Sequence, residues 1–270
     1  MILHRAIYKR VVKDFNKNIL FPVKVSTWSD APPGSGLGTS STLVVAILSA
    51  YVEILNLPLG DYDIANLAYE IERIDCKFAG GKQDQYAATF GGFNFIEFYD
   101  NNRVIVNPLR VRRATELELQ SSLMLYYTGQ SRESAKIIKD QIKSMSHNND
   151  AQSEKSLSAM HEVKKISFET KESILKGDIN KFHSLLSASW NAKKNMAKTI
   201  STNKIESIAA IALNAGAKGL KISGAGGGGF MIISIEPADK FSILEALNNE
   251  GGKFINFSFT SNGVESWKVV

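Results

Sequence analysis

The sequence predicts an α+β protein of two domains, and three of its features predict this. Residues 21–28 alternate apolar and polar side chains as a strand does, and an apolar run of helical length covers residues 43–55. The glycine-rich loop Pro32–Thr42 (PPGSGLGTSST) lies between them. In the second half, short strands and helices follow in the order βαββαβ around a helical insertion. This is the order of a ferredoxin-like sandwich, so we expect that fold there.

The first domain is expected to span residues 1–110. Apolar spacing and turn residues predict a helix at 3–15, a strand at 21–28, helices at 40–55, 61–76 and after the turn at 80–86, and a hairpin of 93–99 with 104–106. In the helix at 61–76 the predicted buried stripe is Ile64, Leu67, Ala68, Ile71 and Ile74. Glu72 stands at the edge of that stripe, where it can face a cleft.

The second domain is expected to span residues 111–270, after a stretch at 108–115 where the apolar pattern lapses. Its predicted strands are at 123–128, 220–223, 230–235 and 254–259. Its predicted helices are at 133–145, 154–175, 179–196, 204–215 and 238–248. A second glycine run, Gly224–Gly229, joins two of the strands. Such a run lets another stretch of backbone pass close by.

Composition bounds the class of protein. A chain of 270 residues with 44% hydrophobic residues is long enough for one large or two small domains, and its single cysteine excludes a disulfide framework. No apolar run reaches the length of a membrane span, and the first 15 residues lack the apolar core of a signal peptide. The net charge of +5 is scattered and forms no basic stripe with interleaved aromatics. We therefore expect a cytoplasmic protein that binds neither membranes nor nucleic acid.

The loop has the properties of a phosphate cradle. Gly34, Gly36 and Gly38 can take positive φ and let the backbone approach a polyphosphate, and the helix N-terminus that follows favours an anion. The residues expected to hold the nucleotide are Pro33, Gly34, Ser35, Gly36, Leu37, Gly38, Thr39, Ser40 and Ser41. The loop lacks the lysine of the Walker-type pattern and the spacing of the dinucleotide fingerprint. An ordinary flexible loop or linker is the alternative interpretation.

Asp84 is the candidate general base for transfer of a phosphoryl group to a hydroxyl. It follows the Gly80-Gly81 turn at a predicted helix N-terminus, and Lys82 lies two residues before it. Both features are expected to favour the ionised carboxylate, and Lys82 is included among the catalytic residues. A simple helix cap is the alternative role for Asp84.

The loop string PPGSGLGTSS resembles the phosphate-binding motif of the GHMP kinases, the family of galactokinase, homoserine kinase and mevalonate kinase. The segment from Glu72 to Gln85 resembles the part of these kinases that holds a metal-binding glutamate and the catalytic aspartate. The resemblance implies ATP, Mg²⁺ on Ser40 and Glu72, and Asp84 as base. The run Lys221–Phe230 resembles the family's third motif, which implies that Gly226 and Gly227 lie at the nucleotide. A purely structural turn is the alternative there.

The resemblance implies a truncated N-terminal β/α nucleotide-binding domain and a C-terminal ferredoxin-like domain. Within the family, the runs at 57–60, 80–92 and 127–138 resemble sugar 1-kinases that act on D-glycero-D-manno-heptose 7-phosphate. Family members begin with a strand and a Gly-Gly-Gly-Thr-Asp-like segment, which we do not find before the helix at 3–15. Roughly 80 residues are therefore expected to be absent, and the chain to be impaired alone.

Other interpretations stay open from the sequence. The chain could be a nucleotide-binding fragment that has lost its acceptor site, or a kinase for another sugar such as fucose; a homodimer is also left open. Lys193, Lys194 and Lys198 could meet a substrate phosphate, although a solvated helix face is the alternative. The segment 128–133, at a strand-to-helix junction, could meet a substrate or form a capping turn.

Overall fold

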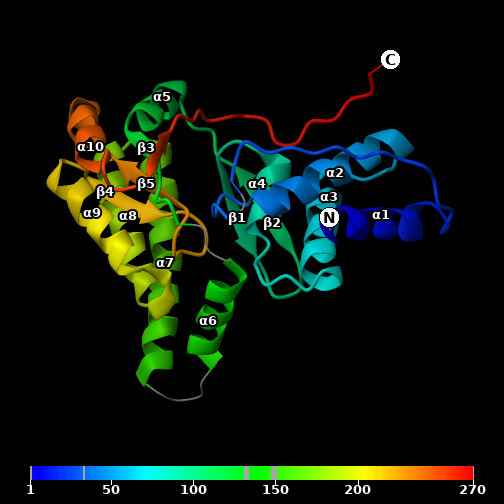
Figure 1. The fold of residues 1–270 in the computed structure, drawn as a ribbon, viewed down its shortest axis with the longest axis horizontal. Helices are drawn as coiled ribbons and strands as arrows, with labels where there is room; N and C mark the ends of the chain where they lie inside the picture. Colours follow the sequence, from blue (N-terminus) through cyan, green and yellow to red (C-terminus); the bar gives the residue numbers. More distant parts are fainter. Residues whose placement is uncertain (1, 33, 131–133, 147–150, 270) are drawn as a thin grey trace. The chain divides into compact units, whose positions relative to one another are not determined.

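The structure is a computed structural model that describes all residues except 1, 33, 131–133, 147–150 and 270. Its chain divides into two compact units (Figure 1). The first unit comprises Met1–Pro33, Gly38–Pro108 and Thr260–Val270, and the second comprises Gly34–Leu37 and Leu109–Phe259. The loop residues 34–37 thus belong to the second unit, and the last segment of the chain belongs to the first. The expected division of the chain into domains at residues 1–110 and 111–270 stays a prediction.

The first unit is built mainly of helices around one apolar core. Its elements are α1 (Ile2–Phe15), α2 (Thr39–Leu55), α3 (Asp61–Tyr69), the π-helix η1 (Glu70–Asp75), α4 (Gln83–Phe90), and the strands β1 (Asn94–Phe98) and β2 (Val104–Pro108). Ile7 and Val11 of α1 pack in one cluster with Leu48 of α2 and with Ile64 and Ile71. These positions recur at helical spacing, which is why the sequence predicts these helices correctly.

The expected hairpin is confirmed. β1 pairs with β2 in antiparallel register, with Ile96 opposite Val106, and the turn closes through the Tyr99 N–H, which donates to the Arg103 carbonyl at 3.0 Å. The pair packs with Tyr86 of α4 in a small second cluster. The hairpin therefore packs against α4 through Tyr86, and Asp84 is not part of this cluster.

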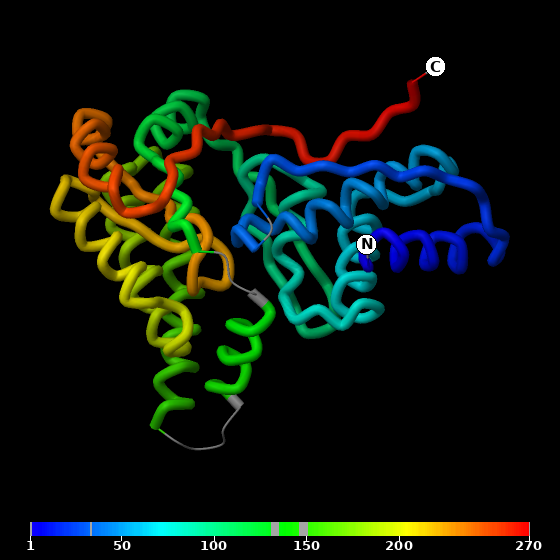
Figure 2. The backbone as a smooth tube through the Cα atoms, in the orientation of Figure 1, coloured from blue at the N-terminus to red at the C-terminus, as the bar shows by residue number. Residues whose placement is uncertain are grey.

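The prediction of a strand at residues 21–28 was wrong. The described residues from 18 to 29 have no regular secondary structure, and they follow an extended path in Figure 2. A strand needs a neighbour with which to exchange backbone hydrogen bonds, and among the described residues of this unit the sheet consists of β1 and β2. Phe21 is held instead by the Tyr8 hydroxyl, which donates to its carbonyl at 2.8 Å, while Trp28 is 87% exposed.

A second correction concerns the end of the helix at 61–76. The chain changes from α-helix to π-helix at Glu70, so the α-helical wheel no longer applies beyond that residue. Ile74 was expected in the buried stripe and is 59% exposed, whereas Glu72 is 1% exposed. The wider turn therefore brings the carboxylate of Glu72 inward more completely than an α-helix would.

The second unit contains a four-stranded antiparallel sheet in the order β4-β5-β3-β6. Its strands are β3 (Leu123–Tyr127), β4 (Gly219–Ile222), β5 (Phe230–Ser234) and β6 (Lys253–Ile255). Its helices are α5 (Arg113–Ser121), α6 (Ser134–Ser146), α7 (Ala151–Lys176), α8 (Ile179–Lys194), η2 (Lys198–Ile200), α9 (Asn203–Asn214), η3 (Pro237–Asp239) and α10 (Lys240–Leu247). β3 and β6, the first and last strands of this sheet in the sequence, are neighbours in the sheet. The chain order βαββαβ with this strand order confirms the ferredoxin-like sandwich.

The core of this unit lies between the sheet and its helices (Figure 1). Tyr126, Ile222 and Met231 of the sheet share one cluster with Trp190 of α8 and Ile205 of α9. Two details differ from the expectation. β6 has three residues, where the sequence predicts six, and α5 was not predicted. Only Thr115 and Leu119 of α5 are buried, so its apolar signal is weak.

Within the described part of the chain, every helix is too short or too polar to cross a lipid bilayer.

Candidate active site

A buried carboxylate joins three elements of the first unit. Glu72 of η1 accepts hydrogen bonds from the Ser40 hydroxyl at 2.6 Å and the Ser41 hydroxyl at 2.7 Å, both in the first turn of α2. The Gln85 amide, in the first turn of α4, donates to the same carboxylate at 2.6 Å. Three elements that are far apart in sequence therefore meet at one side chain.

Arg73 supplies the counter-charge that a buried carboxylate requires. Its guanidinium lies 3.3 Å from the Glu72 carboxylate and also donates to the Gly81 carbonyl at 3.2 Å. The guanidinium of Arg73 packs against Gly80, where a Cβ would have to displace it. The Gly80-Gly81 turn is therefore shaped by the arginine that passes beneath it.

Asp84 lies directly against the end of the glycine loop. A Cβ added to Gly38 would stand 3.0 Å from the Asp84 Cγ, and the Gly38 φ is +72°. Gly34 and Gly36 also have positive φ, as the sequence predicts. The catalytic candidate and the last glycine of the loop are thus in contact within one unit. If the Asp84 carboxylate lay far from the glycine loop, the structure would not support a role for it in phosphoryl transfer.

The pKa of Asp84 depends on its burial and on two charged neighbours. Burial raises the pKa of the Asp84 carboxyl, Arg73 lowers it in part, and Glu72 raises it again. Lys82 and the helix N-terminus were expected to favour the ionised carboxylate. The cation that lowers the pKa of Asp84 is Arg73, and burial, which raises this pKa, has the larger effect.

Lys82 is directed elsewhere in the first unit. Its ammonium donates to the Asn102 side chain at 2.8 Å and lies 4.7 Å from the centre of the Tyr69 ring. These contacts tie the turn before α4 to the β1–β2 hairpin. The structure therefore brings together Asp84, Glu72, Ser40 and Ser41, but does not join Lys82 to them.

The raised pKa of Asp84 has a measurable consequence for the pH profile. A general base acts in its deprotonated form, so activity should fall as the pH drops through the pKa of Asp84 in the free enzyme. We expect the acid limb of kcat/KM to lie above the ordinary aspartate range, because burial raises this pKa. Arg73→Lys retains the positive charge and should move the limb little, whereas Arg73→Met should move it to higher pH. An acid limb at the same pH in both variants would contradict this assignment.

The loop residues 34–37 are held by the second unit. The Phe230 N–H donates to the Ser35 carbonyl at 3.2 Å, and a Cβ added to Gly224 would lie 2.6 Å from the Gly36 carbonyl oxygen. Ser35 is buried, while Gly34 and Leu37 are exposed. The second glycine run was expected to let another stretch of backbone pass close by, and the stretch that does so at Gly224 and Gly229 is the first glycine loop. Pro33 lies outside the described residues.

Gly226 and Gly227 have different neighbours. A Cβ on Gly226 would lie 2.7 Å from the Ile200 carbonyl oxygen, and the Gly227 N–H donates to that oxygen at 2.6 Å. These two glycines pack on η2, whereas Gly224 and Gly229 pack on the first loop. Their contact with a nucleotide remains a prediction.

Gly229 offers a test of this packing. Its φ is +85°, and a Cβ there would overlap the Ser35 carbonyl oxygen. Gly229→Ala should lower the free energy of unfolding by roughly 2–4 kcal/mol, from backbone strain and overlap together. Gly81→Ala is the matched control, because a Cβ there meets nothing within 4 Å, and it should change stability by less than about 0.5 kcal/mol. Equal urea midpoints for the two variants would contradict the close approach.

The donor set of the first unit fits a magnesium ion that is held mainly by phosphate and water. The described residues contain no group of three or more His, Cys, Asp or Glu side chains that could hold a metal by themselves. They do place one carboxylate and one hydroxyl together, at Glu72 and Ser40. The buried Oε1 of Gln85 has no hydrogen-bond partner, so an acceptor is left over at the same place. Mg²⁺ on a nucleotide typically takes few protein ligands of this kind.

Comparison with known protein families decides the class. Residues 3–92 match the GHMP kinases N terminal domain, and residues 170–253 match the GHMP kinases C terminal domain. The chain belongs to the GHMP kinase family.

Relatives of this GHMP kinase chain include characterised and solved proteins. It is 47% identical over 267 residues to D-glycero-alpha-D-manno-heptose 7-phosphate kinase of Campylobacter jejuni, an alignment that covers 99% of this chain and 77% of the relative. The crystal structure of a D-glycero-D-manno-heptose 1-phosphate kinase from Bacteroides thetaiotaomicron is 40% identical, with a TM-score of 0.79 over 100% of this chain and 75% of the other. A putative sugar kinase from Campylobacter jejuni is 45% identical, with a TM-score of 0.77 over 99% and 75%.

The sequence did not predict two residues of this GHMP kinase site that hold the Glu72 carboxylate. Arg73 and Gln85 stand next to the predicted Glu72 and Asp84 in sequence, and both bond to the buried carboxylate. A buried carboxylate needs a cation and hydrogen-bond donors, and that need is the signal that could have found them. Glu70, which points away on the helical wheel, bonds instead to Arg10.

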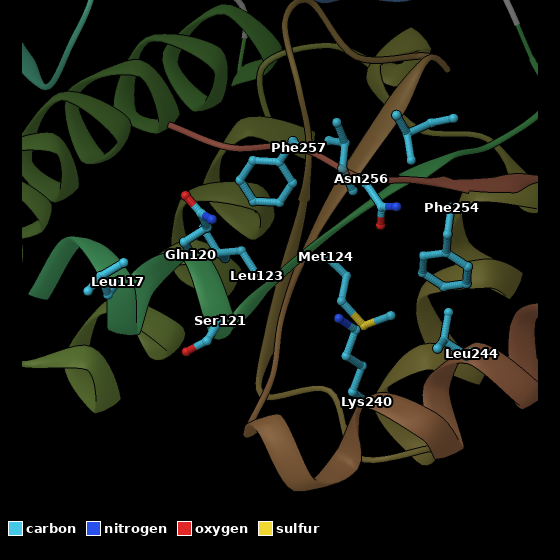
Figure 3. Close-up of a pocket in the computed structure, with 12 residues that line it drawn as sticks. Leu117, Gln120, Ser121, Leu123, Met124, Lys240, Leu244, Phe254, Asn256 and Phe257 are labelled. Atoms are coloured by element: carbon cyan, nitrogen blue, oxygen red, sulfur yellow. The ribbon is translucent and has the colours of Figure 1, made fainter. Parts of the chain in front are cut away.

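A pocket of about 380 Å³ lies elsewhere in the second unit (Figure 3). Met124, Leu244 and Phe254 form its apolar wall, and Lys240 and Gln120 are polar residues in its lining. None of the residues predicted for the active site lines it, so it takes no part in the proposed reaction. Of the segment 128–133, Thr128 is buried and donates to the Gly229 carbonyl at 2.9 Å, and residues 131–133 lie outside the described residues.

Proposed function

We propose that this chain transfers the γ-phosphoryl group of ATP to the anomeric hydroxyl of a sugar phosphate, D-glycero-D-manno-heptose 7-phosphate. The observation that carries the proposal is the contact between Asp84 and Gly38, which puts a carboxylate at the end of a loop suited to phosphate. The sugar is taken from the Campylobacter jejuni relative of 47% identity, a D-glycero-alpha-D-manno-heptose 7-phosphate kinase.

Each site residue has a proposed role. The main chain of Gly34, Ser35, Gly36, Leu37, Gly38, Thr39, Ser40 and Ser41 binds the triphosphate, because glycine φ values and a helix N-terminus favour an anion there. Glu72 and the Ser40 hydroxyl are the ligands proposed for Mg²⁺, which when bound neutralises charge on the phosphates. Ser41, Gln85 and Arg73 hold the Glu72 carboxylate in place through the contacts described above.

Asp84 is proposed to accept the proton of the anomeric hydroxyl. As the hydroxyl oxygen attacks, its bond to the γ-phosphorus forms, the bond from the γ-phosphorus to the β,γ-bridging oxygen breaks, and ADP leaves. The proton passes to the Asp84 carboxylate. Burial of Asp84 favours this transfer, since a raised pKa makes the carboxylate a stronger base. The cytoplasmic location and the oligomeric state remain predictions.

A coupled assay of ADP release tests the proposal. With ATP and Mg²⁺, we expect release that depends on heptose 7-phosphate, with kcat/KM at least about 100-fold above that for L-fucose or unphosphorylated heptose. Phosphorus NMR should show a new phosphate on the anomeric carbon. Release that depends on fucose would favour the alternative kinase. ATP binding without sugar-dependent release would favour a non-catalytic nucleotide-binding protein.

A further inference from the structure

The pocket in the second unit that the proposed reaction does not use has the properties of a binding site. Its volume of about 380 Å³ lies in the range of small-ligand sites, which begins at roughly 300 Å³. Its lining comes from α5, β3, β6 with the residues that follow it, and α10, and most of it is apolar. Leu117 and Ile255 line the pocket and are still 48% and 41% exposed. A ligand that covered these apolar side chains would be stabilised by removing them from water.

The pocket lies where β6 leaves β3. β6 ends at Ile255, which stands opposite Leu125. Continued in the same antiparallel register, the strand would place Phe257 opposite Leu123. The chain leaves the sheet instead, and Leu123, Asn256 and Phe257 line the pocket. The space beside β3 that two more residues of strand would fill is therefore open to a ligand.

The main chain of Leu123 faces this space. The Ser122 carbonyl accepts from the Ile235 N–H at 2.8 Å, and the Thr128 N–H donates to the Gly229 carbonyl at 2.9 Å. Peptide groups alternate sides along a strand, so the even-numbered residues from 122 to 128 direct theirs toward β5. The N–H and carbonyl of Leu123 therefore point to the side of β6, which has already ended there. One donor and one acceptor are left for a ligand.

The charge of the pocket is positive. Of the described residues that line it, Lys240 alone is charged. Figure 3 shows the Lys240 side chain extending from α10 toward Met124 of β3. No described carboxylate lies within ion-pair distance of its ammonium group, and the neighbouring Asp239 pairs with Lys218 at 3.1 Å. An ammonium group beside apolar walls, without a counter-charge, favours an anionic ligand over a neutral or cationic one.

We propose that this pocket binds a small organic anion, with its apolar part against Met124 and Leu244 and its carboxylate or phosphate group at Lys240. The peptide group of Leu123 supplies hydrogen bonds to further polar atoms of the ligand. A sugar phosphate suits the pocket poorly, because its hydroxyl groups would lie against apolar walls. The pocket shares no residue with the proposed phosphoryl-transfer site, so this inference does not rest on the proposed function.

Methyl NMR of the full chain labelled with ¹³C-methyl methionine tests the site, because Met124 lines the pocket and Met124→Leu identifies its signal. The probes share one alkyl chain and are octanoate, octyl phosphate, octanol and octylammonium. Lys240→Met removes the charge of an exposed side chain, and Lys240→Glu reverses it. Lys253→Met is the matched control, because Lys253 is an exposed lysine of β6 that does not line the pocket. Thermal unfolding verifies each fold, and Lys240→Gln replaces a Lys240→Met chain that is destabilised.

We expect octanoate, octyl phosphate or both to shift the Met124 methyl signal with a Kd below about 1 mM. Octylammonium should bind at least about threefold more weakly, as one partly exposed charge pair would give. Lys240→Met should weaken binding of the anions by a similar factor and leave octanol unaffected. Lys240→Glu should make octylammonium bind more tightly than octanoate, and Lys253→Met should change neither. The tighter of the two anions identifies the preferred head group.

The proposal is overturned if neither anion moves the Met124 signal at millimolar concentration, since the pocket would then be closed in solution. It is also overturned if octanol and octylammonium bind as tightly as the anions, or if Lys253→Met loses as much affinity as Lys240→Met. None of these titrations contains ATP or a sugar. Binding at the pocket by a chain that releases no ADP would therefore leave this inference standing while the proposed function fails.

Discussion

Asp84→Asn should lower kcat by about 10²–10⁴-fold, the usual contribution of general acid–base catalysis. The amide has nearly the shape of the carboxylate but cannot accept the proton of the anomeric hydroxyl. Because Asp84 contacts Gly38 through its Cβ and Cγ, the variant should preserve the loop. The affinity for ATP should therefore stay within about threefold. Steady-state kinetics with heptose 7-phosphate and a nucleotide titration measure both quantities.

Asp100→Asn is the matched control for that substitution. Asp100 lies exposed in the turn between β1 and β2, outside the contacts of the loop. Its replacement should leave both kcat and nucleotide affinity unchanged. If Asp84→Asn retained more than about a tenth of the activity, the assignment of Asp84 as base would be wrong.

Glu72→Gln is expected to have the second largest effect, on activity and on stability together. Ser40, Ser41 and Gln85 all donate to the Glu72 carboxylate, and one amide oxygen cannot accept all three bonds. The variant also leaves the Arg73 guanidinium without its buried counter-charge. We expect a loss of roughly 2–4 kcal/mol in the free energy of unfolding. We also expect kcat to fall at least about 100-fold, with a higher Mg²⁺ concentration needed for half-maximal rate.

Glu70→Gln separates the metal role from general damage to the helix. Glu70 lies two residues away in the same π-helix, and its carboxylate pairs with Arg10. Its replacement should cost some stability but leave the Mg²⁺ dependence unchanged. An unchanged Mg²⁺ dependence in Glu72→Gln, at equal or lower activity, would contradict the proposed metal ligand.

Much of the fold could be predicted from periodicity, because helix faces carry their signal locally. The stripe that includes Ile64 and Ile71 and the alternation of β3 and β5 both follow from burial of one face. The failures arise where structure depends on distant partners. Residues 21–28 have the pattern of a strand but lack a neighbouring strand, and Ile74 follows a change to π-helix that no α-helical wheel can show.

In the candidate site, too, the features set by local sequence could be predicted and those that depend on distant residues could not. Positive φ at Gly36 and Gly38 and the placement of Asp84 follow from loop chemistry and motif spacing. The partners of the buried charges do not, since the contacts of Arg73 with the Glu72 carboxylate and with the turn at Gly80 and Gly81 depend on how these segments fold together. Lys193 was expected at a solvated face for the same reason. Lys193 is half-buried, and one of its neighbours is Lys221 of β4, which lies more than twenty residues further along the chain.

The crystal structure of this chain with Mg²⁺ and a non-hydrolysable ATP analogue tests the central claim most directly. The quantity to measure is the distance from the γ-phosphorus to the nearer carboxylate oxygen of Asp84. We predict a value below roughly 6 Å, enough for one hydroxyl oxygen between them, with the triphosphate on the main chain of the loop. A triphosphate bound away from Gly36 and Gly38, or a γ-phosphorus more than roughly 10 Å from Asp84, would contradict the account.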